Sequence, residues 1–132
     1  MHSHASATAT EAPKVENTLT TATDITAIGD PVYINGSNTI GKALAADNTK
    51  SRVIGLVRVG AGAAGSTPDV VSHGIATAVL TGATPGVPYY LQAAGGIGTA
   101  LPAGGNRVIC MGYAINATDL FVEMRDYGKK AA

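Results

Sequence analysis

The sequence predicts an all-β protein, a small β-barrel or sandwich built from two similar β-units with an extended N-terminal arm. Short β-prone runs alternate with Gly, Pro and Asn residues about every 8–12 positions, which is the spacing of strands and turns in such folds. No segment places its apolar residues at the helical period of about 3.6 residues. In addition, three blocks of the first half recur in the same order in the second half.

The composition is unusually poor in charge. Charged residues make up 14% of the 132 positions, and nine basic side chains balance nine acidic ones. A typical globular domain has about 25% charged residues. The zero net charge excludes the positive surface of a nucleic-acid-binding protein, and no apolar run approaches the roughly 20 residues that span a membrane. Because few charges remain for a solvated surface, we expect other copies of the chain, in a dimer or trimer, or a partner to cover part of it.

Seven runs are rich in β-branched, aromatic or other apolar residues and are bounded by turn residues. They are residues 31–35, 52–59, 70–73, 75–80, 88–92, 107–115 and 120–125. We expect the third and fourth runs to form a pair of strands about Gly74, since glycine permits the backbone of a tight turn. Residues 116–119, Asn-Ala-Thr-Asp, are expected to form a hairpin turn between the last two runs.

An internal repeat is the most informative feature of the sequence. Its blocks pair residues 29–35 with 86–92, 40–44 with 97–101, and 51–54 with 106–109. The first pair shares Gly, then Pro two positions later, then Tyr, an aliphatic residue and a carboxamide. The offset is 57 positions in the first two pairs and 55 in the third, which places a two-residue deletion in a loop. We therefore expect one β-unit used twice, with each copy covering the apolar side of the other.

The chain divides into an arm at residues 1–23 and a single β-domain at residues 24–132, with repeat units at about 29–59 and 86–115. The arm is rich in Ala, Thr, Ser and Glu, and Pro13 interrupts any helix there. This composition is also typical of a disordered tail, and the sequence leaves the two interpretations open. For an arm that orders on a neighbouring molecule, four residues are the expected partner-binding anchors. They are Val15, Leu19, Thr20 and Ile25.

Two glycine-rich motifs resemble nucleotide-binding loops but lack their context. Residues 36–42 read Gly-x-x-x-x-Gly-Lys, yet Ala43 stands where a phosphate-binding loop needs Ser or Thr for its metal ion. Residues 60–65 read Gly-x-Gly-x-x-Gly, yet Pro68 follows where a dinucleotide-binding fold requires a helix. We interpret both motifs as turns between strands, and we expect no cofactor.

The side chains that usually carry catalysis are scattered along the chain. His73 has no Cys or Glu at the spacing of a zinc site, and His2 and His4 lie together without a third ligand nearby. Cys110 lies in an apolar run, which favours a buried thiol over a reactive thiolate. The acidic residues near the C-terminus alternate with apolar ones, as on the solvent face of a strand. The sequence therefore predicts no enzyme activity, no catalytic residue and no metal site.

Three segments resemble small virion proteins of tailed bacteriophages, and most of all their capsid decoration, or cement, proteins. They are Gly-Asp-Pro-Val at 29–32, Arg-Val-Ile-Gly at 52–55 and Gly-x-x-Tyr-Tyr-Leu at 86–91. The resemblance covers about residues 24–128. It implies a structural protein without catalysis or cofactor, made in the host cytoplasm. Such a protein stabilises the capsid from its outer surface by binding where major capsid proteins meet.

The end of the chain, residues 108–125, also resembles β-modules of phage tail fibres. A receptor-binding module of the tail fibre or tail tip is therefore the alternative function. In that interpretation, four tyrosines would offer a surface on which a carbohydrate stacks. They are Tyr33, Tyr89, Tyr90 and Tyr113. We expect instead that these tyrosines cover the edge of the core; a small enzyme that uses His73 is a third hypothesis.

Overall fold

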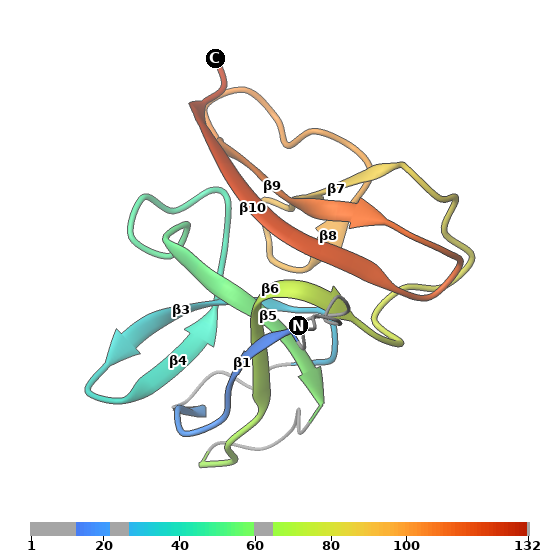
Figure 1. The fold of residues 1–132 in the computed structure, drawn as a ribbon. Coiled ribbons are helices and arrows are strands. Elements are labelled where there is room, and N and C mark those ends of the chain that lie inside the picture. The colour runs from blue at the N-terminus through green and yellow to red at the C-terminus, as the bar shows by residue number, and fades with distance from the viewer. Residues whose placement is uncertain (1–12, 22–26, 60–64, 132) are drawn as a thin grey trace, which may run out of the picture.

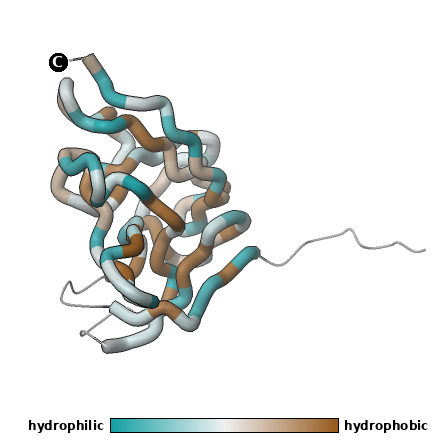
Figure 2. Tube along the Cα trace, turned by 90° about the vertical axis from the view of Figure 1, so that its left-hand side faces the viewer, coloured by the Kyte–Doolittle hydropathy of each residue, from teal (hydrophilic) through white to brown (hydrophobic). Residues whose placement is uncertain are grey.

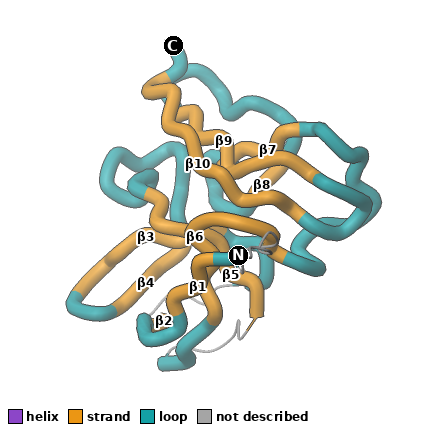
Figure 3. Tube along the Cα trace, in the orientation of Figure 1, coloured by secondary structure: helices purple, strands orange, loops and turns teal. Residues whose placement is uncertain are grey.

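The computed structural model describes residues 13–21, 27–59 and 65–131, in which all regular structure is β-strand (Figures 1 and 3). The strands are β1 (Lys14–Glu16), β2 (Thr20–Thr21), β3 (Pro31–Gly36), β4 (Thr39–Lys42), β5 (Val53–Val59), β6 (Asp69–Ala76), β7 (Pro88–Leu91), β8 (Ile97–Gly98), β9 (Arg107–Ala114) and β10 (Leu120–Lys129). They form one sheet in the order β2-β4-β3-β5-β6-β10-β9-β7-β8, and β1 pairs with β6 beside this path. The predicted all-β class is confirmed, although the sheet is not closed into a barrel.

A single strand, β6, joins the two halves of the sheet. Its residues 69–71 pair with β5, and its residues 74–76 pair with β10. At the change of partner, Gly74 has a φ of 105°, and a Cβ there would lie 2.8 Å from the Cα of Pro13. The expected pair of strands about Gly74 is therefore wrong. The glycine bends one continuous strand and does not reverse the chain.

The two halves of the sheet repeat the same strand order. Unit 1 has the order β4-β3-β5-β6, where β6 contributes its first part, and unit 2 has the order β8-β7-β9-β10. The edge of β10 pairs with the second part of β6, and the edge of the first part of β6 pairs with β1. The expected use of one β-unit twice is thus visible in the sheet, and Figure 1 shows the units one above the other with β6 between them.

The cross-strand register keeps the offset of 57 residues from the first three strands of unit 1 (β3, β4 and β5) to those of unit 2 (β7, β8 and β9). Pro31 lies opposite Leu56 in unit 1, and Pro88 lies opposite Tyr113 in unit 2. In each ladder, the register shifts after the second pair of opposed residues, so the two β-bulges are at equivalent positions. Each residue of β5 therefore corresponds to the residue of β9 that lies 57 positions later, and the offset of 55 taken from residues 51–54 is wrong.

Two equivalent glycines give the physical reason for this register. A Cβ on Gly55 would lie 2.7 Å from the carbonyl oxygen of Val71. A Cβ on Gly112 would collide with the carbonyl oxygen of Phe121. Only glycine allows a neighbouring strand to approach so closely. The Arg-Val-Ile match reflects a composition that many buried strands share, whereas the close approach at glycine sets the alignment.

Two apolar clusters form the core. The larger cluster lies between the units and joins Leu56 and Val71 of unit 1 to residues of unit 2 that include Met111, Leu120 and Val122. The smaller cluster lies on the opposite side of unit 1. It consists of Val32, Ile40, Val57 and Val70, with Leu19 and Ile54 packed against it. Unit 1 therefore buries apolar residues on both faces, and Figure 2 shows apolar segments in both units.

Candidate binding surfaces

The N-terminal segment, residues 13–21, lies on unit 1. β1 extends the edge of β6, with Val15 opposite Val71, and β2 pairs with β4 at the far edge of the unit. The backbone N–H of Thr20 donates a hydrogen bond of 3.1 Å to a carbonyl oxygen in the β3–β4 turn. Between the two strands, Leu19 packs against the smaller cluster. The segment thus crosses unit 1 from one edge to the other.

The predicted partner-binding anchors pack on the chain's own core. Val15 contacts the larger cluster and Leu19 the smaller one, while Thr20 belongs to β2. Ile25 lies outside the described residues. Val15, Leu19 and Thr20 are each only half-buried, so the segment keeps an outer surface. Their binding to another molecule stays a prediction.

A row of directly opposed side chains crosses each unit. Residues that lie opposite one another in an antiparallel ladder point to the same face of the sheet. The row of unit 1 consists of Val15, Val71, Leu56 and Pro31. The equivalent row of unit 2 consists of Ile75, Phe121, Tyr113 and Pro88. We call the side of each unit that carries its row the row face, and the opposite side the back face.

The two row faces differ in exposure. Leu56 and Val71 are 0% exposed, because the row face of unit 1 packs against the back face of unit 2 in the larger cluster. Tyr113 and Ile75 are 42% and 39% exposed. The row face of unit 2 is therefore open in the part of the chain that the structure describes.

Further side chains extend the open row face of unit 2. Tyr90 lies opposite Cys110, which in turn lies opposite Arg125 (the bulge in β9 brings these residues to the row face). Burial, followed by repulsion from neighbouring ionisable groups that include Cys110 and Tyr127, raises the pKa of Tyr90. Burial also raises the pKa of the Cys110 thiol. Both groups are therefore neutral at physiological pH. Tyr90 adds an aromatic ring to the row face, and the buried Cys110 lies beneath it.

Sequence reasoning missed this surface, because it assigned all four tyrosines to the edge of the core. Tyr33 is buried and Tyr89 packs against the larger cluster, as expected, but Tyr113 is exposed on the row face. A signal was available in residues 108–115, which are apolar, aromatic or glycine at odd and even positions alike. A strand that is apolar on both faces is stable only when other residues bury both of those faces.

The side chains considered for catalysis or metal binding lie on different strands or outside the described residues. No three His, Cys, Asp or Glu side chains come together as metal ligands within residues 13–21, 27–59 and 65–131. The exposed His73 meets the ring of Phe121 edge-on, with 5.4 Å between ring centroids. Cys110 is buried. The Gly-x-x-x-x-Gly-Lys motif spans the β3–β4 hairpin, while His2, His4 and most of the second glycine motif lie outside the described residues.

A groove of about 440 Å³ lies between the start of β5 and the β9–β10 ladder. Its lining residues are Ser51, Arg52, Val53, Ile54, Ile109, Met124 and Asp126. The Asp126 carboxylate accepts hydrogen bonds from Arg107, with an N–O distance of 3.1 Å, and is thus already paired. Beside its apolar residues, the groove presents Ser51, Arg52 and one carboxylate that is already in an ion pair, which is not the paired-carboxylate arrangement of a glycoside hydrolase.

No family model, curated protein or solved structure matches the chain. Among the described residues, no helix has the length and apolar character required to cross a membrane. The geometry of the two units is therefore the evidence on which a function can be argued.

Proposed function

We propose that this chain is a structural virion protein that decorates a phage capsid, bound to the outer surface where major capsid proteins meet. The sequence resemblance motivates the proposal, and one structural observation carries it. The N-terminal segment lies extended across unit 1 and pairs with both edges of that unit, which leaves its outer side available to a partner. A decoration protein needs such a binding surface and no chemistry.

Unit 1 also carries exposed apolar side chains. Ile34 is 47% exposed and lies opposite Ile40, a member of the smaller cluster, so it belongs to the back face of unit 1. Ile28 and Val59 are 52% and 47% exposed. Exposed apolar groups rimmed by polar residues are typical of protein-binding surfaces. On a capsid lattice, many copies of a modest contact add up to a strong reinforcement.

Titration onto capsids that lack this chain tests the proposal. Ile34→Asp should weaken binding about tenfold or more, because a charge is then desolvated in an apolar contact. Leu101→Asp is the matched control, since Leu101 is 52% exposed on unit 2 and lies away from the proposed contact. Equal binding by the wild type and Ile34→Asp would contradict binding through the back face of unit 1.

A truncation that starts at Pro13 tests the rest of the arm. It removes residues 1–12 and keeps β1 and β2, which belong to the sheet. We expect weaker capsid binding with an unchanged midpoint of unfolding, because the removed residues precede the paired strands. A truncation beyond Thr21 is unsuitable, since it also removes the partner of the β6 edge.

The alternative, a tail-fibre or tail-tip module, is favoured by a different observation. The open row face of unit 2 presents Tyr113, and aromatic rings are the side chains on which sugars stack. Immunogold labelling of virions separates the two functions. Label spread over the head supports decoration, whereas label confined to the tail tip supports receptor binding.

A further inference from the structure

The row faces of the two units are equivalent in register and differ in what covers them. Leu56 and Val71 at the centre of the row of unit 1 are fully buried under the back face of unit 2. Tyr113 and Phe121 occupy the equivalent positions in unit 2, where Tyr113 is 42% exposed. The same position in the same β-unit is thus an interface in one copy and an open surface in the other.

The shape of the open row favours a second β-sheet as its cover. The row crosses four adjacent strands, which at about 4.8 Å per strand is a width of about 15 Å. Its side chains are flat rings or compact aliphatic groups. The equivalent row of unit 1 packs face to face on a sheet, an arrangement in which sheets lie about 10 Å apart. A sheet of the same kind would bury the row of unit 2.

A head-to-tail contact between copies would have to use a sheet face whose apolar centre is already covered by the described residues. Within the chain, the row face of unit 1 meets the back face of unit 2, so the matching contact between molecules would use the back face of unit 1. The four buried residues of that face are only 0–1% exposed, with Leu19 of the N-terminal segment packed against them. The open apolar sheet face that a second copy offers, in its described residues, is its own row face of unit 2.

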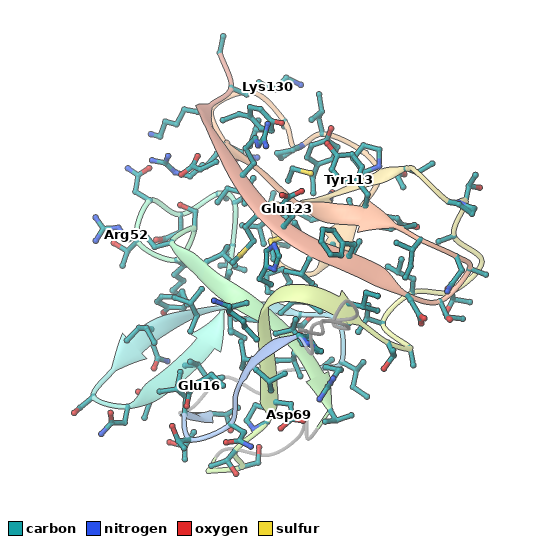
Figure 4. The ribbon with its side chains drawn as sticks, viewed as in Figure 1. Glu16, Arg52, Asp69, Tyr113, Glu123 and Lys130 are labelled. Atoms are coloured by element: carbon teal, nitrogen blue, oxygen red, sulfur yellow. The ribbon has the colours of Figure 1, made fainter. Side chains whose placement is uncertain are left out.

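The charges on the row face favour the same contact. Arg125 lies opposite Cys110 of the row face, and Glu123 is exposed, whereas Met124 between them packs against the larger cluster on the other side of β10. Both charged residues are exposed, and neither makes an ion pair within the described residues. Figure 4 labels Glu123 and Tyr113 over the β9–β10 ladder. A two-fold axis that passes near Met124, midway between the two residues, would bring Glu123 of each copy to Arg125 of the other.

We propose that the row face of unit 2 is a dimer interface, on which a second copy of this chain packs its own row face around a two-fold axis. Glu123 and Arg125 pair across the two-fold axis, and Ile75, Phe121 and Tyr113 are buried beside it. This interface is separate from the proposed capsid-binding surface, which lies on the back face of unit 1.

Sedimentation equilibrium of the full chain tests the dimer directly. We expect the wild type to sediment as a dimer at micromolar concentration, and Tyr113→Asp to raise the dissociation constant at least about tenfold. Ile34→Asp is the matched control, because it places the same charge on a side chain that is 47% exposed but lies on unit 1. Its dimer should be unchanged. Circular dichroism and the midpoint of unfolding serve as the check that both variants are folded.

A charge exchange tests the two-fold geometry. Glu123→Arg and Arg125→Glu should each weaken the dimer, because each single variant sets like charges against one another at both ends of the contact. The double variant restores opposite charges and should recover most of the lost affinity. Such a recovery does not follow from a general effect on folding or solubility.

Three results would overturn the proposal. The first is a wild-type chain that stays monomeric up to its limit of solubility. The second is a dimer that Tyr113→Asp and Ile34→Asp weaken equally. The third is a monomer whose Tyr113→Asp variant loses affinity for capsids or for carbohydrate, which assigns the row face to that occupant. The sedimentation experiment contains this chain alone, so its failure leaves the proposed capsid binding to be judged by the titration onto capsids.

Discussion

Unit 1 and unit 2 have one backbone register but opposite surroundings. Leu56 of unit 1 and Tyr113 of unit 2 are equivalent residues, each opposite a proline on one side and opposite Val71 or Phe121 on the other. The first is 0% and the second 42% exposed. Exposure of a row face in this fold therefore depends on whether another unit packs over it. Unit 2 packs over the row face of unit 1, whereas no described residues cover the row face of unit 2 in the same way.

The back faces show the same dependence on position. Unit 1 covers the back face of unit 2, whereas the N-terminal segment contributes Leu19 to cover the back face of unit 1. β1 likewise occupies on β6 the edge that the second part of β6 occupies on β10. The N-terminal segment therefore occupies on unit 1 the strand edge and the sheet face that unit 1 occupies on unit 2.

The largest expected effect tests the equivalence of the two glycines. Gly112→Ala should lower the free energy of unfolding by about 3–5 kcal/mol, because the new Cβ collides with the backbone of the neighbouring strand. Gly55→Ala should be similarly severe, with its Cβ 2.7 Å from a carbonyl oxygen. Urea-induced unfolding measures both variants.

Gly82→Ala provides the control for this pair. Gly82 has a φ of 62° and no atom within 4 Å of a Cβ, so its substitution carries backbone strain without a collision. A loss of about 1–2 kcal/mol is expected. A loss at Gly112 no larger than at Gly82 would break the equivalence between the units at this position.

The second effect compares the two row centres directly. Leu56→Ala should cost about 2–5 kcal/mol of unfolding free energy, because it opens a cavity in the larger cluster. Tyr113→Ala should cost less than about 1 kcal/mol in the monomer, since the ring is largely open to solvent. Denaturant unfolding at a concentration where the chain is monomeric gives both values. Equal costs at the two positions would show that the row face of unit 2 is covered after all.

The third effect concerns the edge of β6 with which β1 pairs. Val15→Ala should cost about 1 kcal/mol, because Val15 is half-buried and contributes to the row of unit 1. Lys14→Ala, on the same short strand but exposed, should change stability by less than about 0.5 kcal/mol. Thermal unfolding monitored by circular dichroism resolves the pair. An unchanged midpoint of thermal unfolding in Val15→Ala would mean that β1 adds nothing to the core.

The smallest effect is expected in the turn that joins the last two strands of unit 2. A hydrogen bond from the backbone N–H of Ala78, followed by those from Asn116 and Thr118, lowers the pKa of the Asp119 carboxyl. The Asp119 carboxylate therefore stabilises the fold above its ordinary pKa of about 3.9, and this contribution is lost as the pH falls through the lowered value. Asp119→Asn should flatten the acid side of a plot of unfolding midpoint against pH. A variant profile parallel to that of the wild type down to low pH would contradict this role.

Most of the long strands and the repeat were predictable from the sequence, whereas the continuity of β6, the register and the open surface were not. The turn at residues 116–119 was correct because Asn116 accepts hydrogen bonds from the backbone N–H groups of Thr118 and Asp119, as its side chain favours. Gly74 was misread because a glycine that bends a strand and one that reverses it have the same local sequence.

The remaining errors have a common physical origin. The alignment of β5 with β9 depends on how closely Gly55 and Gly112 approach a neighbouring strand, which is a tertiary property. The exposure of the Tyr113 side chain likewise depends on whether another sheet lies over it. Strand propensity and turn chemistry are local, so they identify the unit correctly but not what covers each copy of it.

The central claim is that the second unit repeats the first with an offset of 57 residues through its long strand. Backbone NOEs between opposed strands test it most directly. We predict contacts between Leu56 and Val71 and, in unit 2, between Tyr113 and Phe121. An NOE pattern that places Met111 opposite Phe121, as an offset of 55 requires, would contradict the equivalence of the two row faces and the dimer interface inferred from it.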